Sequence, residues 1–132
     1  FKVPSMSFCL VGRWIGHMRS GVFRHQSIGK AAPQKAECLI GWVSHYVIGI
    51  LFALLLTLPN DGLWLQNPSL WMALLVGVAT LVFPFFLMQP ALGSGIAASK
   101  TPSPAKARLK SLLTHSVFGL GLYLSGRLFS ML

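Results

Sequence analysis

Residues 41–58 read GWVSHYVIGILFALLLTL, a stretch without Asp, Glu, Lys or Arg that is long enough to cross the hydrocarbon core of a bilayer. Two further apolar stretches follow, at residues 69–88 and 109–126, and none of the three contains an acidic residue. A cleaved signal peptide explains one such segment near the start of a chain, not three. The sequence therefore predicts an all-α, polytopic membrane protein with three transmembrane helices.

The composition agrees with this prediction. The chain has 132 residues, 54% hydrophobic and only 10% charged, whereas soluble domains carry about 25% charged residues. The net charge is +9, but the basic residues cluster between the apolar runs and form no basic helix of a nucleic-acid module. We expect a single membrane domain over residues 1–132, with the lipid bilayer as partner and no nucleic acid.

Local signals mark the ends of the spans. Pro59 and the Asn60-Asp61-Gly62 turn end the first, Asn67-Pro68 is a capping signal for the second, and Pro84 should kink the second. Residues 1–20 are too short and interrupted to span, so we expect an interfacial helix there. The Gly12 to Gly16 spacing is a weak packing signal, because an arginine lies inside it.

The distribution of basic residues gives an orientation through the positive-inside rule. The loop at residues 60–68 has no basic residue and contains Asp61. We therefore expect a bacterial inner-membrane protein with residues 19–40 and 91–110 in the cytoplasm and the C-terminus outside. The basic residues that carry this expectation are Arg19, Arg24, Lys30 and Lys35 before the first span, and Lys100, Lys106, Arg108 and Lys110 before the third.

The two cysteines, Cys9 and Cys38, show neither a C-x-x-C pairing nor a metal-type spacing. Both precede the first span, on the side expected to be cytoplasmic, where thiols usually stay reduced. We therefore assign them little structural signal.

A motif inside the first span recurs 70 residues later. Residues 44–49 (SHYVIG) and 114–119 (THSVFG) share the pattern [ST]-H-x-V-[IF]-G, which favours an internal duplication of a two-helix hairpin. His45 and His115 then lie at matching depth, with Gly49 and Gly119 one turn further along the same face. On this view a helix preceding Phe1 would complete a four-helix unit.

Two interpretations of this histidine pair stay open. A polar ring inside a membrane helix is a functional candidate, so His45 and His115 are candidates for holding a metal or a b-type haem, with Gln89 completing a polar pocket. Alternatively, each ring lies near the interface and bonds a hydroxyl or a backbone carbonyl. The sequence leaves the cofactor undetermined.

A second group of candidates lies outside the bilayer. Arg13, His17, Arg24 and His25 could contact an anionic headgroup or a phosphate-bearing ligand, or could simply hold the loop inside. The later stretch GSGIAASKT, residues 93–101, lacks the glycine that a phosphate loop needs before its lysine, and we do not assign it as one. Glu37 and Asp61 are expected on opposite sides of the bilayer, so they predict no hydrolytic site.

Several motifs together indicate a family: VGRWIGH at 11–17, GVFRH at 21–25, GWVSHYVIG at 41–49, FPFFLMQPALGSGIAASKTP at 83–102 and THSVFGLGLY at 114–123. With them the chain resembles the DUF2938 family of small bacterial integral membrane proteins over nearly its whole length. The resemblance implies a further hydrophobic helix before this sequence. It implies no activity and supplies no catalytic residues.

Two functional hypotheses follow. One is a non-enzymatic membrane component, of the transport or channel-like type, completed by homo-oligomerisation. The other is a membrane redox protein that binds haem or a metal through the paired transmembrane histidines.

Overall fold

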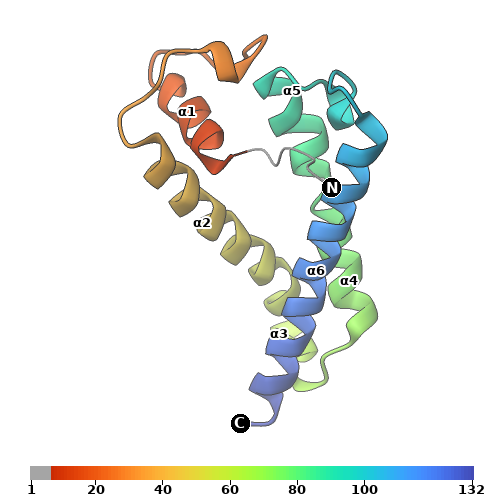
Figure 1. Ribbon diagram of the computed structural model, residues 1–132. Helices are drawn as coiled ribbons and strands as arrows, with labels where there is room; N and C mark the ends of the chain where they lie inside the picture. Colours follow the sequence, from red (N-terminus) through yellow and green to blue (C-terminus); the bar gives the residue numbers. More distant parts are fainter. Residues whose placement is uncertain (1–6) are drawn as a thin grey trace. The chain divides into compact units, whose positions relative to one another are not determined.

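The computed structural model describes residues 7–132, and within that range the chain forms helices and connecting loops without a strand (Figure 1). The predicted all-α class is confirmed for these residues. The first part of the predicted interfacial segment, residues 1–6, lies outside the described range. The chain divides into two compact units: unit 1 contains the described residues up to Ile48 with Phe83–Arg108, and unit 2 contains Gly49–Val82 with Leu109–Leu132.

The expected N-terminal helix is α1, Phe8–Met18. Its first turn is capped by Ser7, whose side chain accepts a hydrogen bond from the backbone N–H of Cys9 at 3.2 Å. A loop and the short 3₁₀ helix η1, Ile28–Lys30, lead from α1 to the first predicted span. Whether α1 lies at a membrane interface stays a prediction.

The first predicted span is the helix α2, Glu37–Thr57. It ends one residue before the predicted limit, at the Pro59 to Gly62 turn. The next helix is α3, Pro59–Gln66. Three residues inside it, Asn60, Asp61 and Gly62, have positive φ angles, so the right-handed helical conformation is interrupted there.

The second predicted span, residues 69–88, contains two helices, and a third continues beyond its end. α4, Leu70–Ala79, is capped by Ser69 through the N–H of Met72 at 3.1 Å, two residues after the predicted Asn67 cap. After a turn the chain continues as the π-helix η2, Pro84–Met88, and as α5, Gln89–Leu92. Proline has no N–H for the helical ladder, which explains an interruption in front of it.

The third predicted span lies inside α6, Pro104–Ser130, which follows the short helix η3, Ile96–Ala98. Among the described helices, two runs are long and apolar enough to cross a membrane: Glu37–Thr57 and Leu70–Leu92. α6 is long enough but less apolar, because Lys110 and His115 lie within its predicted span. Three transmembrane helices are therefore not confirmed, and the third stays a prediction.

In unit 1, α1 and α2 cross at a pair of glycines. A Cβ atom on Gly12 would overlap the backbone carbonyl of Glu37, and one on Gly41 would overlap that of Phe8. Glycine is needed at both positions because the two backbones approach each other directly.

The same crossing brings Cys9 and Cys38 together as a disulfide with a Cα–Cα distance of 3.8 Å. The expectation that these cysteines carry little structural signal is wrong. Each cysteine precedes its crossing glycine by three residues, in CLVG at 9–12 and in CLIG at 38–41. Residues three apart lie on one face of a helix, so the glycine contact places both thiols in the same interface.

In unit 2, α4 and the later part of α6 lie side by side at a second glycine pair (Figure 1). A Cβ on Gly77 would lie 2.6 Å from the carbonyl oxygen of His115, and one on Gly119 would lie 2.8 Å from that of Ala73. Ala73 is fully buried there. Small residues that let backbones approach closely are typical of helix packing in membranes.

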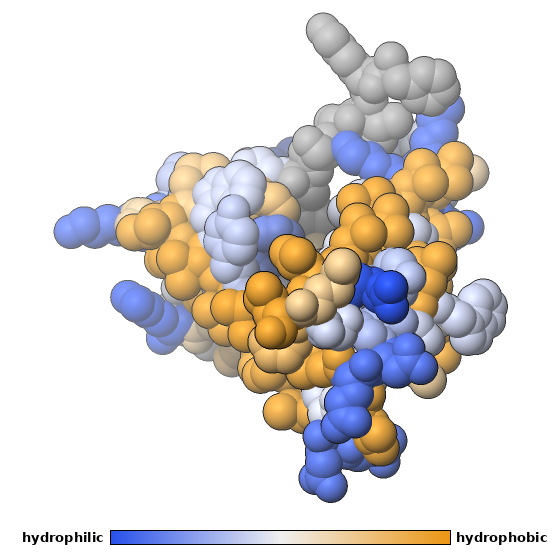
Figure 2. All heavy atoms as spheres, turned by 90° about the horizontal axis from the view of Figure 1, so that it is seen from below, coloured by the Kyte–Doolittle hydropathy of each residue, from blue (hydrophilic) through white to orange (hydrophobic). Residues whose placement is uncertain are grey.

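Both apolar runs keep most of their surface uncovered. Only 11% of the apolar window of Glu37–Thr57 and 22% of that of Leu70–Leu92 is buried. Leu51 and Leu55 of α2 are 54% and 60% exposed, and Trp71 of α4 is 76% exposed. Apolar residues cover much of the face drawn in Figure 2. Both runs are thus long and apolar enough to cross a membrane, and most of each window is unburied.

Candidate functional site

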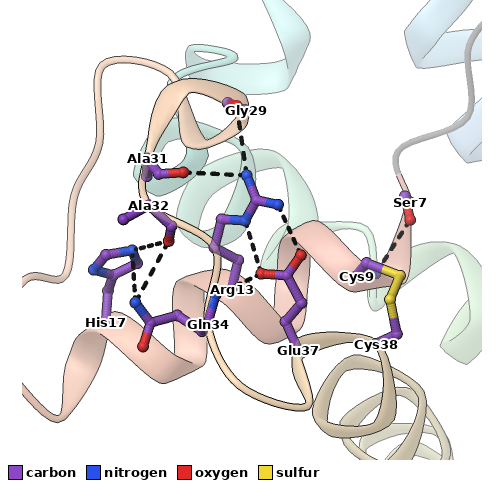
Figure 3. Close-up of polar contacts among 10 residues, drawn as sticks. All are labelled: Ser7, Cys9, Arg13, His17, Gly29, Ala31, Ala32, Gln34, Glu37 and Cys38. Atoms are coloured by element: carbon purple, nitrogen blue, oxygen red, sulfur yellow. Dashed lines mark hydrogen bonds and ion pairs between the residues drawn. A yellow bond between two sulfur atoms is a disulfide. The ribbon is translucent and has the colours of Figure 1, made fainter.

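Arg13 is the centre of a polar cluster that joins α1, η1 and the start of α2 (Figure 3). Its guanidinium holds Glu37 in a two-pronged ion pair, with Nε 2.9 Å from Oε2 and Nη2 2.7 Å from Oε1. Its Nη1 also donates to the carbonyls of Gly29 and Ala31. The hydrogen bond to Glu37 raises the pKa of Arg13. Arg13 was a predicted anion contact, and in this structure its partner is an internal carboxylate.

Glu37 accepts a further bond from the backbone N–H of Gln34 at 2.8 Å. The carboxylate therefore closes the turn that begins α2 while it binds Arg13. Planar two-pronged pairing of this kind fixes orientation as well as charge. The cluster joins α1 to the start of α2, and we therefore assign it a structural role.

His17 lies next to this cluster. Its Nε2 is 2.9 Å from the carbonyl oxygen of Ala32 and 3.3 Å from the side-chain nitrogen of Gln34 (Figure 3). Its ring meets the ring of His25 edge to face, with centroids 5.0 Å apart. The structure thus brings together two of the four predicted anion contacts, but His17 already has a backbone partner.

His25 and Arg24 face a different environment. The backbone N–H of His25 donates to the carbonyl of Ala91 at 2.8 Å, which ties the loop after α1 to α5. The buried Nε2 of His25 has no hydrogen-bond partner among the described residues. Burial lowers the pKa of His25, and the neighbouring His17 lowers it further. Both effects favour the neutral form of the ring.

A hollow of about 760 Å³ opens where these two segments meet, with walls from residues 24–26 and from positions between 90 and 100. Gly93 closes it at one side with a φ of +93°, and a Cβ there would overlap the carbonyl of Gln26. Arg108 donates from Nε to the carbonyl of Ala97 at 2.7 Å and fastens the loop. Sequence reasoning found Arg24 and His25 but missed the loop opposite them, because no phosphate-loop pattern marks it.

In unit 2, His115 has two polar partners near the second glycine crossing. Its Nδ1 lies 2.8 Å from the hydroxyl of Thr80 and 3.2 Å from the carbonyl oxygen of Gly77. The hydroxyl of Thr80 donates its one hydrogen to the carbonyl of Gly77 at 2.6 Å. In the tautomer with its proton on Nδ1, the ring donates to these two oxygens, and Nε2 keeps its lone pair.

His45 has a different setting in unit 1. Its ring lies among aromatic rings, with centroids 4.3 Å from Phe8, 5.5 Å from Tyr46 and 6.0 Å from Trp42. Aromatic groups of this kind are common at membrane interfaces. The two histidines belong to different units, His45 to unit 1 and His115 to unit 2.

The glycines that follow them also differ. Gly119 is at a helix crossing, whereas a Cβ on Gly49 would meet nothing within 4 Å. The local packing therefore does not show the internal repeat, which stays a prediction. Gln89 is buried in unit 1, and its Oε1 has no partner among the described residues. Within residues 7–132, no three His, Cys, Asp or Glu side chains gather where they could hold one metal ion.

Comparison with known proteins gives one match. The model of a family described as "Protein of unknown function (DUF2938)" matches residues 1–129. This confirms the family resemblance drawn from the motifs. No curated protein and no solved structure matches the chain.

Proposed function

The chain belongs to the DUF2938 family, and from this premise we propose that it is a multi-pass protein of the bacterial inner membrane. We propose further that it acts as a non-enzymatic component of the transport or channel-like type. The supporting observation is the pair of long apolar helices whose side chains remain uncovered. In water, a contiguous apolar surface of this extent would lead to aggregation. In a bilayer it is the surface that lipid covers.

The assignment to a non-enzymatic class is supported by the use of the carboxylates. The chain has only Glu37 and Asp61 as acidic residues. Glu37 is held by Arg13 and the backbone of Gln34, and Asp61 belongs to the other unit. In unit 1 the described carboxylate is therefore occupied by a structural pair and is not free for general acid or base chemistry.

The exposed apolar faces also support a homo-oligomer that completes the bundle. Chemical cross-linking in native membranes, followed by denaturing electrophoresis, should give discrete multimers of the 14.4 kDa chain. Monomers alone, at cross-linker doses that trap a known membrane dimer, would contradict this part of the proposal.

Membrane insertion is tested by placing a charge in the first apolar run. Leu51 and Leu39 are both exposed leucines of α2, but Leu51 lies at its middle and Leu39 near its start. A lysine at the middle of a span costs about 3 kcal/mol of insertion free energy, and one at the end costs much less. Leu51→Lys should therefore remove most of the protein from the alkali-resistant membrane fraction, and Leu39→Lys should not. Equal behaviour of the two variants would contradict the proposal, because exposed leucines of a water-soluble protein accept lysine at either position.

The proposed orientation can be tested on the disulfide. With residues 19–40 in the cytoplasm, Cys9 and Cys38 lie on the reducing side, so the bond should be open in growing cells and close on oxidation after lysis. Rapid acid quenching followed by alkylation should label both thiols. A fully oxidised pair in quenched cells would place this side of the protein outside and reverse the orientation.

A second candidate function, haem or metal binding for redox chemistry, is favoured by one observation. Nδ1 of His115 lies within hydrogen-bond distance of Thr80 and Gly77, and in the tautomer with its proton on Nδ1 the second nitrogen, Nε2, keeps its lone pair. Metal-binding histidines usually show this arrangement, with the second ring nitrogen donating to an oxygen. Purified protein would then show a Soret band or bound metal that is lost in His115→Ala. Absence of both signals from protein purified out of metal- and haem-supplemented cells would remove this candidate.

A further inference from the structure

The hollow in unit 1 has two cationic side chains on its walls. Arg24 comes from the loop after α1, and Lys100 comes from the end of the loop after α5. Within the described part of unit 1 neither side chain has an ion-pair partner, because Glu37, the one carboxylate there, is bound by Arg13. Two like charges that converge on one hollow without a carboxylate form a site of positive potential.

Uncharged polar groups line the same hollow. Ser99 is exposed on its wall, with its hydroxyl close to Gly95. Gly95 has a φ of +76° and is buried, and a Cβ there would overlap the hydroxyl of Ser99, so the loop folds back closely on itself at this point. The buried Nε2 of His25, also on the wall, has no partner in the described part of the chain. A buried polar atom without a partner costs free energy, which a bound ligand would recover.

The position of the hollow along the chain adds a second argument. α5 ends at Leu92, which is also the last residue of the second apolar run. The lining residues between 90 and 100 therefore lie at the point where the chain leaves the apolar run, which is the level of the lipid headgroups if the run spans. This argument rests on the proposed function, whereas the charges and the unpartnered nitrogen do not.

We propose that this hollow is a binding site for a phosphate group, held by Arg24 and Lys100 with Ser99 and His25 as hydrogen-bonding neighbours. The planar guanidinium suits two oxygens of one phosphate, and the ammonium neutralises the remaining charge. The group can come from an anionic lipid headgroup or from a free phosphate, and the chemistry of the site is the same for both. The site is not a phosphate loop, since Ser99 stands where that pattern needs a glycine before its lysine.

The test is lipid binding by the purified full chain in a neutral detergent, followed by native mass spectrometry. The probes are phosphatidylglycerol, diacylglycerol with the same acyl chains, and inorganic phosphate as competitor. We expect phosphatidylglycerol to bind and diacylglycerol not to bind. Arg24→Gln and Lys100→Gln should each weaken binding roughly fivefold, and the double variant about thirtyfold. Lys100→Arg should retain binding because it keeps the charge.

The controls remove the same charges elsewhere in unit 1. Arg19 and Lys35 are exposed and do not line the hollow, so Arg19→Gln with Lys35→Gln should leave binding within about twofold of the wild type. Equal loss in this control pair would reduce the effect to net charge and overturn the site. Equal binding of phosphatidylglycerol and diacylglycerol, or full binding by the Arg24→Gln, Lys100→Gln variant, would also overturn it.

The competitor distinguishes the two sources of phosphate. Displacement of phosphatidylglycerol by millimolar inorganic phosphate identifies a site for free phosphate groups, and resistance to it identifies a headgroup site. Failure of the membrane proposal is also separable. If Leu51→Lys stays in the membrane fraction as Leu39→Lys does, but inorganic phosphate still binds through Arg24 and Lys100, the membrane assignment falls and the phosphate site stands. If the protein inserts as proposed but binds no phosphate through Arg24 and Lys100, the phosphate site falls and the membrane assignment stands.

Discussion

The two glycine crossings solve the same packing problem with different chemistry. In unit 1, α1 and α2 meet at Gly12 and Gly41, and a disulfide and the Arg13–Glu37 ion pair surround the contact. In unit 2, α4 and α6 meet at Gly77 and Gly119, and the polar contacts there are the bonds among Thr80, Gly77 and His115. Both crossings bring backbone against backbone.

The difference follows from the solvent that we assign to each. At the edge of a membrane, a charged pair keeps part of its hydration, so its desolvation penalty next to a helix crossing is small. Inside hydrocarbon, a charge is expensive, and a hydroxyl that bonds an imidazole supplies direction without ionisation. The comparison predicts that unit 1 depends on covalent and ionic contacts and that unit 2 depends on close packing.

The largest effect is expected from loss of the disulfide. Its two cysteines are 29 residues apart, and a loop of that length corresponds to about 3.5 kcal/mol of chain entropy. Compared with the disulfide-bonded wild type, the double variant Cys9→Ser, Cys38→Ser should have a free energy of unfolding of unit 1 that is lower by about this amount. Hydrogen exchange in α4, which belongs to unit 2, should not change. Reductant should reproduce the effect in the wild type and change nothing in the variant. A uniform loss of protection in both units would show that the units are not independent.

The next effect concerns the glycine at the crossing of α1 and α2. Gly12→Ala places a Cβ in the carbonyl of Glu37, so the helices must separate at a cost of about 3 kcal/mol. Gly49→Ala is the matched control on α2, because a Cβ there has open space, and it should be neutral. The free energy of unfolding in mild detergent measures both. Equal stability of the two variants would contradict the crossing.

The corresponding change in unit 2 should be smaller. In Gly77→Ala the nearest backbone atom, the carbonyl oxygen of His115, lies 2.6 Å from the new Cβ, and a small shift of α6 relieves it at about 2 kcal/mol. Gly121→Ala on α6, with nothing within 4 Å, serves as control. An effect of Gly77→Ala that exceeds that of Gly12→Ala would reverse the ranking of the two crossings.

The smallest predicted effect tests the polar contact of unit 2. Thr80→Val removes the hydroxyl that lies between Gly77 and His115 and should cost about 1 kcal/mol. Thr114→Val is the control, because the hydroxyl of Thr114 bonds only the Lys110 carbonyl of its own helix, at 2.8 Å. The ring signals of His115 in an NMR spectrum should shift in the first variant and stay in place in the second. Unshifted signals in Thr80→Val would show that this hydrogen bond does not form.

The sequence predicted the helices well because a long apolar run in lipid must satisfy its own backbone hydrogen bonds, and a helix does this. α2 ends within one residue of its predicted limit, and the turn that follows contains the predicted Pro59 to Gly62 residues. The two helix crossings were not predicted. Packing of glycine against glycine depends on which helices are neighbours, and hydropathy carries no such information.

One signal for the first crossing was nevertheless present. The string C-L-[VI]-G occurs at 9–12 and again at 38–41, and both copies lie in the interface. The Gly12 to Gly16 spacing is a weak packing signal by itself, because Arg13 lies inside it. The arginine is tolerated there because Glu37 neutralises it at the start of the partner helix. For the anion contacts, no pattern in the sequence indicates that Arg13 forms a structural ion pair whereas Arg24 lines a hollow.

The length of α6 has a consequence of its own. Its 27 residues correspond to about 40 Å at 1.5 Å per residue, whereas the hydrocarbon layer is about 30 Å thick. If α6 crosses upright, roughly two turns of it project into water, and Lys106 and Arg108 lie on the projecting end. The alternative is a steep tilt, and membranes of different thickness would change its angle. Reconstitution into bilayers of graded acyl length, with measurement of the helix tilt, would therefore distinguish the two cases. The tilt angle changes with bilayer thickness if α6 is tilted, and stays constant if its end projects into water.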